Sequence, residues 1–265
     1  MHRPNLDSPY LKLMIYGAPG SGKTWTSATA AQCEEASPVL MLSAAGNPQS
    51  IRSLDKKPDI ISLEQLTDLN EPYDFLAFGQ SPDHPFCRAF GLRPPYKTII
   101  IDSISEVQRF SVRTVTGGGY IEPGNIPPKM ERQHHGAVLG QMLNMANLFY
   151  SLEMNVIMTC LEWARQESVN GAVTYTPLLW GQSVDQVPSY ALMVGRVVKS
   201  RAIPSAWKAI DERLAGDGVI NAMFVVEGER YYAKDQYNTD TLYFLNPTIR
   251  DILAAIAQPV IQASI

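Results

Sequence analysis

Short apolar runs alternate with stretches of helical spacing along the first two thirds of the chain. The strand-like runs cover residues 11–16, 39–43, 59–63, 96–103 and 155–160. The helix-like stretches cover residues 23–32, 104–115 and 137–153. Strands that alternate with helices are typical of a parallel sheet covered by helices on both faces. The pattern therefore predicts an α/β fold with a mostly parallel central sheet.

The last third of the chain shows a different pattern, with β-prone runs joined by turn residues. Residues 162–180 alternate loosely around Asn170-Gly171, a dipeptide typical of hairpin turns. Further β-prone runs cover 192–199 and 219–234, with a capped amphipathic helix at 205–214 between them. We expect antiparallel hairpins added to the parallel core, which argues against a small nucleotide kinase.

We treat residues 1–265 as a single domain with three appendages. Residues 1–10 form an N-terminal extension, and 246–265 a C-terminal helix and tail. Between them, the glycine- and proline-rich stretch 116–135 predicts a long loop.

A glycine-rich segment follows the first predicted strand. It reads Gly17-Ala18-Pro19-Gly20-Ser21-Gly22-Lys23-Thr24, and Trp25 continues it into the first predicted helix. Consecutive backbone N–H groups at such a helix N-terminus point at one spot, where the helix dipole also favours an anion. The spacing G-x-x-x-x-G-K-[ST] is that of a phosphate-binding loop, in which Lys23 reaches the β- and γ-phosphates and Thr24 holds Mg²⁺. The alternative is a glycine turn that only joins a strand to a helix.

A carboxylate ends the fourth predicted strand. Asp102 follows the run Ile99-Ile100-Ile101. A buried parallel strand delivers such a residue to the carboxyl edge of the sheet, where the phosphate-binding loop also lies. We therefore predict that Asp102 supports Mg²⁺ through Thr24 or a water, so the expected cofactors are ATP and Mg²⁺.

Composition excludes several other classes. The net charge of −4 and 18% charged residues provide no global basic surface for nucleic acid, so any such contact must be local. Cys33, Cys87 and Cys160 are an odd number in unrelated settings, which favours reduced core thiols. No apolar stretch approaches the roughly 20 residues that span a bilayer, and residues 1–5 resemble no signal peptide. We expect a cytoplasmic protein without a membrane partner.

Together these motifs resemble the RecA-like ATPases and, within them, phage-encoded nucleotide-binding proteins related to single-strand annealing recombinases. The resemblance runs from residue 11 to about 237. It implies head-to-tail homo-oligomers, rings or filaments, with nucleotide at the subunit interface. It also implies single-stranded DNA as the bound partner, a single-strand binding protein as a further candidate partner, and the cytoplasm of a bacterial host.

The resemblance supplies one residue for action between subunits. Tyr232-Ala233-Lys234-Asp235-Gln236-Tyr237 is similar to the Lys-[Asn/Asp]-Arg segment with which RadA- and KaiC-type relatives reach a neighbour's γ-phosphate. Lys234 is then a candidate trans-acting cation, although Gln236 stands where the family has Arg. The alternative is an ordinary exposed hairpin lysine.

One expected residue is absent. RecA-like ATPases usually place a glutamate after the second strand to orient water, but residues 42–47 read Leu-Ser-Ala-Ala-Gly-Asn. Either Glu106 or Glu162 supplies the carboxylate, or the protein binds ATP and hydrolyses it slowly.

The resemblance also points to a DNA-contacting loop at 116–135 and, second, to residues 164–175. The first loop carries Lys129 and Arg132, with Arg113 at its edge and Tyr120 for base stacking. Glu122 and Glu131 nearly cancel this charge, so a solvated loop is the alternative. Two other functions remain open: a P-loop motor or loader acting on protein or duplex DNA, and a nucleotide-gated assembly protein with little turnover.

Overall fold

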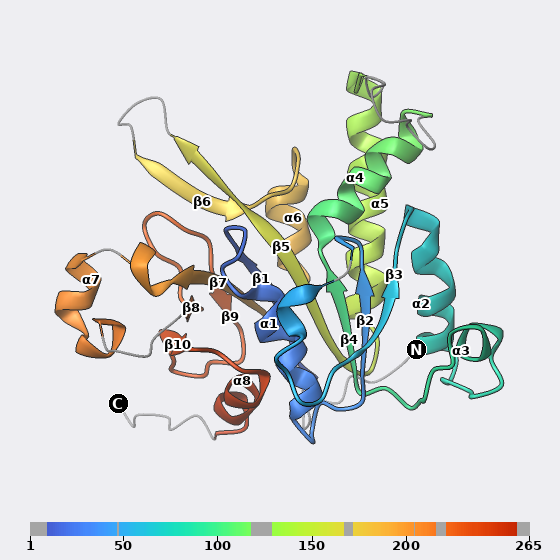
Figure 1. Cartoon of the computed structure of the whole chain (residues 1–265). Coiled ribbons are helices and arrows are strands. Elements are labelled where there is room, and N and C mark those ends of the chain that lie inside the picture. Colours follow the sequence, from blue (N-terminus) through green and yellow to red (C-terminus); the bar gives the residue numbers. More distant parts are fainter. Residues whose placement is uncertain are drawn as a thin grey trace, which may run out of the picture.

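A mostly parallel sheet runs through the centre of the molecule (Figure 1). The computed structural model describes residues 10–46, 48–117, 129–166, 172–203, 205–215 and 221–258. Within them the sheet has ten strands in the order β10-β8-β7-β1-β5-β4-β2-β3, with β6 paired to β5 and β9 paired to β7.

The strands from β3 to β7 in this order pair in parallel, whereas β6, β8, β9 and β10 pair antiparallel. This confirms the predicted parallel core with antiparallel additions. The strands are β1 Lys12–Gly17, β2 Val39–Ser43, β3 Asp59–Ser62, β4 Thr98–Asp102, β5 Asn155–Gln166, β6 Val173–Pro177, β7 Met193–Lys199, β8 Asn221–Phe224, β9 Lys234–Asp235 and β10 Tyr243–Leu245.

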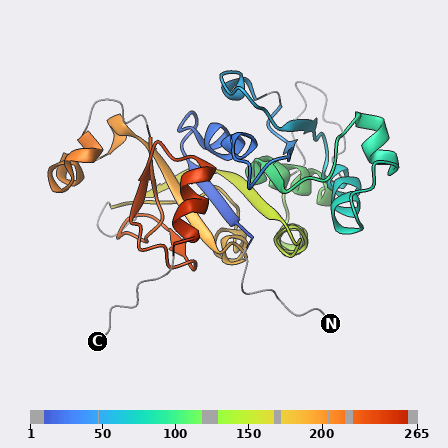
Figure 2. The same ribbon diagram turned by 90° about the horizontal axis from the view of Figure 1, so that it is seen from below.

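Helices cover both faces of the sheet (Figure 2). They are α1 Lys23–Ala28, α2 Asn70–Ala77, α3 Pro85–Phe90, α4 Ile104–Val115, α5 Arg132–Tyr150, α6 Ser183–Ser189, α7 Ser205–Ile210 and α8 Ile249–Ile256. Alternate residues of β1 serve the two faces: Leu13 and Ile15 pack in the cluster with α1 and α8, while Met14 and Tyr16 pack in the cluster with α2 to α6. Burial on both faces explains why the strands are apolar throughout.

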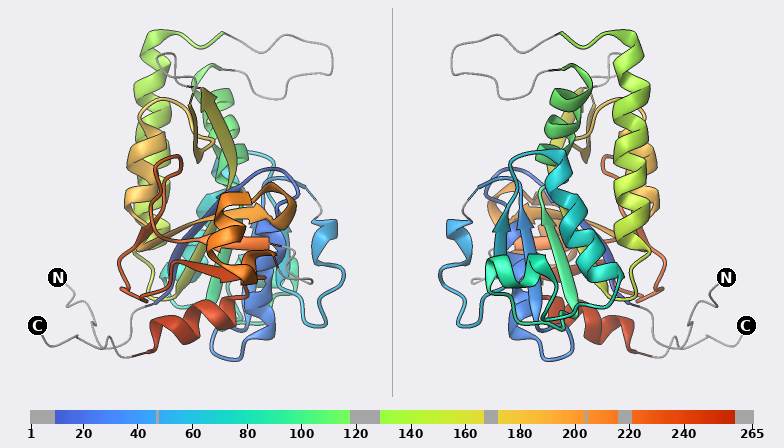
Figure 3. Two further views of the ribbon diagram at one scale, coloured as in Figure 1. Left: turned by 90° about the vertical axis from the view of Figure 1, so that its left-hand side faces the viewer. Right: turned by 90° about the vertical axis from the view of Figure 1, so that its right-hand side faces the viewer.

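Two structures project beyond the sheet at its carboxyl edge. The strand β5 continues past the sheet and pairs with β6 in an antiparallel hairpin, from Glu162 opposite Pro177 to Gln166 opposite Val173. On the other side, α4 and α5 run side by side, and α5 is the tallest element of the molecule (Figure 3). The predicted hairpin at 162–180 is confirmed, and its turn at 169–171 lies outside the described residues.

Several predicted boundaries are wrong. The loop expected at 116–135 is too long, because α5 begins at Arg132, where Glu131 and His134 form a reciprocal capping box. The strand expected at 155–160 is too short, since pairing with β6 extends β5 to Gln166.

Other predicted helices are shorter than expected. Residues 29–32 form a 3₁₀ turn after α1, and α8 begins at Ile249 because Thr248 caps it. Conversely, the segment 72–95 contains most of α2 and all of α3, which its prolines concealed. None of the described helices is long and apolar enough to cross a membrane.

Candidate nucleotide site

The turn between β1 and α1 adopts a conformation that depends on glycine. Gly20 and Gly22 have φ angles of 70° and 102°, which residues with a β-carbon rarely adopt. A β-carbon on Gly17 would lie 2.3 Å from the carbonyl oxygen of Val197 on the neighbouring strand β7. The spacing of the glycines therefore reflects both the turn and its close packing on the sheet.

Lys23, the first residue of α1, reaches back over this turn. Its Nζ donates hydrogen bonds to the carbonyl oxygens of Gly17, at 2.8 Å, and Ala18, at 2.9 Å. Burial lowers the pKa of Lys23, and the nearby carboxylate of Asp102 partly opposes that shift. A phosphate bound at the turn would also favour the charged amine, because it carries negative charge as the carboxylate does. The lysine and the turn thus fit the polyphosphate of a nucleotide.

Asp102 is held by hydroxyl groups on both carboxylate oxygens. The Thr24 hydroxyl donates to Oδ2 at 2.9 Å, and the Thr159 hydroxyl donates to Oδ1. Hydroxyl and carboxylate oxygens are the ligands that Mg²⁺ prefers, with water completing its coordination. The residues present fit the metal: Thr24 would bind it, and Asp102 would orient Thr24 or a bound water. Mg²⁺ would there neutralise charge on the β- and γ-phosphates.

The segment after β2 lies against Asp102. The backbone amides of Ala44 and Ala45 donate to the carbonyl oxygen of Asp102, at 2.7 and 3.3 Å. The Ala45 side chain is exposed at this edge of the sheet. This segment therefore occupies the place from which a glutamate could orient a water near the phosphates, and it carries no carboxylate there.

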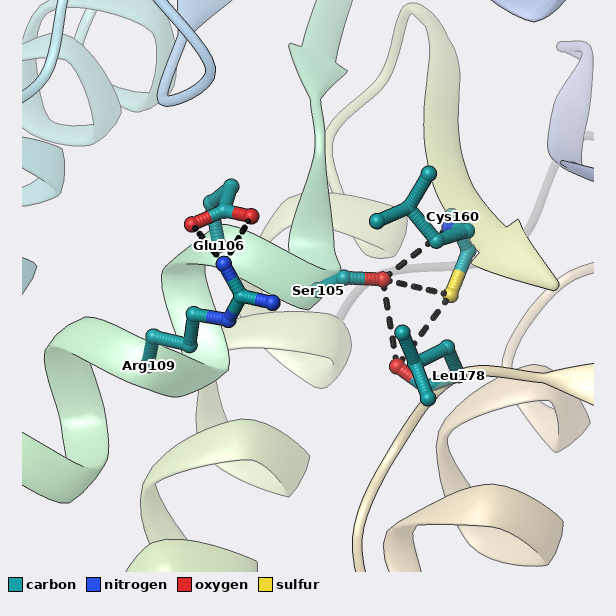
Figure 4. Close-up of polar contacts among 6 residues, drawn as sticks. Ser105, Glu106, Arg109, Cys160 and Leu178 are labelled. Atoms are coloured by element: carbon teal, nitrogen blue, oxygen red, sulfur yellow. Dashed lines mark hydrogen bonds and ion pairs between the residues drawn. The ribbon is translucent and has the colours of Figure 1, made fainter. Parts of the chain in front are cut away.

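The two substitute carboxylates are each paired with an arginine. Glu106, in the first turn of α4, lies 2.8 Å from the guanidinium of Arg109 (Figure 4). Glu162, on β5, lies 2.7 Å from Nε of Arg196, and both side chains are largely buried. Each of the two carboxylates is thus engaged by a guanidinium.

The first turn of α4 also holds the foot of the hairpin, which consists of Cys160 and Leu161 on β5 and Leu178 after β6. The Ser105 hydroxyl accepts a hydrogen bond from the Leu161 amide at 3.0 Å and donates to the Leu178 carbonyl at 3.1 Å. Its oxygen lies 3.2 Å from the Cys160 sulfur (Figure 4). Ser105 comes three residues after Asp102, so the hairpin is attached to the nucleotide site through one short turn.

Lys234 lies far from the phosphate-binding turn of its own chain. It pairs with Val194 near the start of β7, at the amino edge of the parallel strands. Its Nζ donates to the carbonyl oxygens of Ser189, at 2.9 Å, and Ala191, at 2.7 Å. The lysine thus closes the carboxyl end of α6, and its action on a neighbouring subunit stays a prediction.

A different lysine lies beside the turn, and the sequence reasoning missed it. The Nζ of Lys199 lies 3.5 Å from the point where a β-carbon on Gly20 would stand. Lys199 ends β7, the strand next to β1. The sequence did contain a signal for this lysine. Two cations stand at the Lys-x-Arg spacing in Lys199-Ser200-Arg201, whereas Lys234-Asp235-Gln236 has only the lysine. Asn221 likewise packs against Gly22.

The remaining predicted residues are spread around this edge. Trp25 is half-buried and packs on the core cluster beneath α1. The exposed residues Lys129 and Arg132 lie just before and at the start of α5, and Arg113 lies near the end of α4, over the Phe110 ring at 5.4 Å. Tyr120 lies outside the described residues. The three cysteines are buried free thiols, and the described part of the chain holds no cluster of metal-ligating His, Cys, Asp and Glu residues.

Comparison with known families explains this geometry. A family model described as an AAA domain matches residues 10–237. The chain belongs to this family. A search of curated proteins found no match. The AAA domain is an ATPase-type P-loop domain, whose members typically bind ATP with Mg²⁺. The match covers every element that forms the turn, the Asp102 site and the hairpin.

Replacement of Lys23 tests the nucleotide site of this AAA domain. We expect Lys23→Ala to weaken binding of a fluorescent ATP analogue by about 10- to 100-fold, because a charge-assisted phosphate contact is lost. Thr24→Ala should remove the Mg²⁺ dependence of that affinity, and Asp102→Asn should reduce turnover more than binding. Lys56→Ala, at an exposed lysine remote from the turn, is the control. Unchanged affinity in Lys23→Ala would contradict the assignment.

Proposed function

We propose that this chain is an ATPase that assembles head to tail on single-stranded DNA and serves phage-type recombination or strand annealing. The observation that carries the proposal is the common position of three features at one edge of the sheet. The phosphate-binding turn, the β5–β6 hairpin and the ends of α4 and α5 next to residues 118–128 all lie there (Figures 1 and 3). Such an arrangement allows nucleotide and a strand of DNA to be held by neighbouring segments.

Contacts between the turn and the hairpin support coupling of the two ligands. Tyr16 directly precedes Gly17, and its hydroxyl lies 2.5 Å from the carbonyl oxygen of Tyr232 and 3.3 Å from that of Tyr175 on β6. On the other side, Ser105 connects the hairpin to the turn that follows Asp102. A shift of β1, which carries Tyr16, or of β4, which leads into Ser105, would therefore move the hairpin near its foot.

The position of Lys199 favours action on phosphates bound by its own chain. Its amine lies beside Gly20, at the margin of the phosphate-binding turn, and its side chain is half-buried. A head-to-tail contact that brings a cation to the neighbour's phosphates forms a heterologous interface, which closes into a ring or extends as a filament. We propose Lys234, which lies away from the turn of its own chain, as the cation for the neighbour's phosphates, and Lys199 as a cation for the phosphates of its own chain.

One observation favours a second function. The alanines beside Asp102 leave water without an orienting carboxylate, as expected of a nucleotide-gated assembly protein in which ATP fixes subunit packing. A motor or loader acting on protein or duplex DNA is the third possibility. Stimulation of ATP hydrolysis by single-stranded DNA, compared with duplex DNA, distinguishes these functions, because the assembly protein requires no such coupling.

The DNA-binding part of the proposal is tested by charge removal near residues 118–128. We expect the double variant Lys129→Ala, Arg132→Ala to flatten the salt dependence of single-strand binding by about 1.4 in log–log slope, since each phosphate contact contributes about 0.7. Lys56→Ala with Lys57→Ala removes the same charge elsewhere and should leave the slope unchanged. Tyr120→Ala, added to the first pair, should cost about 1–3 kcal/mol per stacked base. Equal affinity of the triple variant and the wild type at low salt would exclude this region from the interface.

Restoring a carboxylate beside Asp102 tests the origin of slow turnover. We expect Ala45→Glu to raise the steady-state ATPase rate by about 10- to 100-fold, part of the 10²–10⁴-fold range of a positioned base. Ala45→Gln has nearly the same size without the charge and serves as the control. Glu106→Gln and Glu162→Gln test the two substitutes. A fast wild-type enzyme, insensitive to both glutamine changes, would show that water is activated elsewhere.

Mixed assemblies test which lysine acts across the interface. Lys23→Ala subunits mixed in equal amounts with Lys234→Ala subunits should recover about a quarter of wild-type activity, because one random interface in four pairs an intact turn with an intact lysine. The same mixture with Lys199→Ala in place of Lys234→Ala should recover nothing, because Lys23 and Lys199 lie at the same site. Lys23→Ala with Thr24→Ala, two defects in one turn, should recover nothing. If only the Lys199→Ala mixture recovers activity, Lys199 acts across the interface and the assignment of that role to Lys234 is wrong.

A further inference from the structure

A cavity of about 560 Å³ lies between the hairpin and the C-terminal strands. Val173 and Tyr175 of β6 form one wall, Arg196 of β7 lies in it, and Trp207 of α7 contributes a further wall together with Tyr231. These residues come from four separate segments of the chain. The cavity is therefore a product of tertiary structure.

Aromatic rings dominate one side of this cavity. Trp207 packs edge-on against Phe224, with ring centroids 4.9 Å apart at 87°, and Tyr231 lies 5.8 Å from the same ring. The buried Phe224 thereby fixes the two outer rings, while 36% of Trp207 stays exposed. Rings that are held in place and partly exposed offer stacking surfaces at low entropic cost. The cavity is thus suited to a flat aromatic ligand.

Arg196 adds hydrogen-bond donors to these rings. Its Nε is engaged by Glu162 at 2.7 Å, and its guanidinium lies over the Tyr175 ring, 3.8 Å from the centroid. The two terminal nitrogens have no hydrogen-bond partner among the described residues, and the side chain lines the cavity. A guanidinium oriented in this way presents paired N–H groups to an acceptor-bearing edge.

We propose that this cavity holds one unstacked base of a single-stranded nucleic acid, a proposal that rests on the single-strand function proposed above. A nucleobase combines a flat π-face for Trp207 and Tyr231 with acceptor atoms for Arg196, and all four bases carry such atoms. A free phosphate is not favoured, because Glu162 already neutralises Arg196 and Glu229 accompanies Arg230 at the rim. The hairpin would deliver the strand to this position, and the capture of one base would add a contact that backbone charges cannot provide.

The first test is fluorescence anisotropy with a labelled, mixed-sequence single-stranded oligodeoxynucleotide, the full chain, Mg²⁺ and a non-hydrolysable ATP analogue. We expect Trp207→Ala to weaken binding by roughly 5- to 100-fold, the range that stacking of one base produces. Phe90→Ala, which removes a ring that is 53% exposed on α3, is the matched control and should bind as the wild type does. Arg196→Lys keeps the charge beside Glu162 but loses the paired donors, so we expect a several-fold loss.

Two further arms identify what is stacked and exclude a folding defect. An oligonucleotide with abasic sites in place of its bases should bind the wild type more weakly, and Trp207→Ala should cause no additional loss on that strand. Trp207→Phe keeps a ring against Phe224 and should stay within about threefold of the wild type. Equal losses for the alanine and phenylalanine variants would overturn the proposal, because they would indicate damage to packing.

The remaining outcomes separate this proposal from the one on which it rests. If the wild type does not bind the single strand at all, the proposed function is wrong and the base pocket is wrong with it. If the wild type binds and Trp207→Ala binds equally well, only the pocket is overturned. A Trp207→Ala variant that changes oligomeric state without DNA, yet keeps full DNA affinity, would identify this face as a contact between copies and would also overturn the pocket.

Discussion

The carboxylate of Asp102 is the centre on which the nucleotide site depends. Its two oxygens accept hydrogen bonds from Thr24 at the start of α1 and Thr159 on β5, while its carbonyl oxygen accepts the amides of Ala44 and Ala45. One residue thus fixes β4 to three other segments. Because the carboxylate is buried, these hydrogen bonds are needed to compensate its lost hydration. The position of any metal or phosphate bound at this edge therefore depends on these contacts of Asp102.

The hairpin is the second consequence of this arrangement. The strand β5 lies between β1 and β4, so the segment that supplies Thr159 to Asp102 continues directly into the hairpin. Tyr16 of β1 and Ser105 of α4 then hold the hairpin near its foot. Burial raises the pKa of Cys160 to about 12, so this sulfur stays a neutral packing group next to Ser105. The foot is therefore a closely packed junction between the nucleotide site and an element that extends away from it.

The local sequence by itself determined the helices and strands with strong hydrophobic periodicity. It also determined the glycine-rich turn, which requires positive φ angles. The boundaries of β2 and α4 match the predicted 39–43 and 104–115, because apolar strands buried on both faces and a helix that starts directly after a strand leave few alternatives. The glycine spacing at 17–24 predicted the turn, since glycine adopts the positive φ angles of Gly20 and Gly22 more readily than any other residue. Asp102 followed from the polarity at the end of a buried strand.

Only the tertiary structure decided which side chains meet. The length of β5 depends on its pairing with β6, which its own sequence does not reveal. Three contacts depend on segments that are remote in sequence: the pairing of Glu162 with an arginine, the carbonyl contacts of Lys234, and the approach of Lys199 to Gly20. The pairing of Glu106 with an arginine depends on rotamers within one helix. The cavity around Arg196 and Trp207 likewise needs four segments in place. Local preferences act over a few residues, whereas these contacts arise only when the sheet order sets which strands are neighbours.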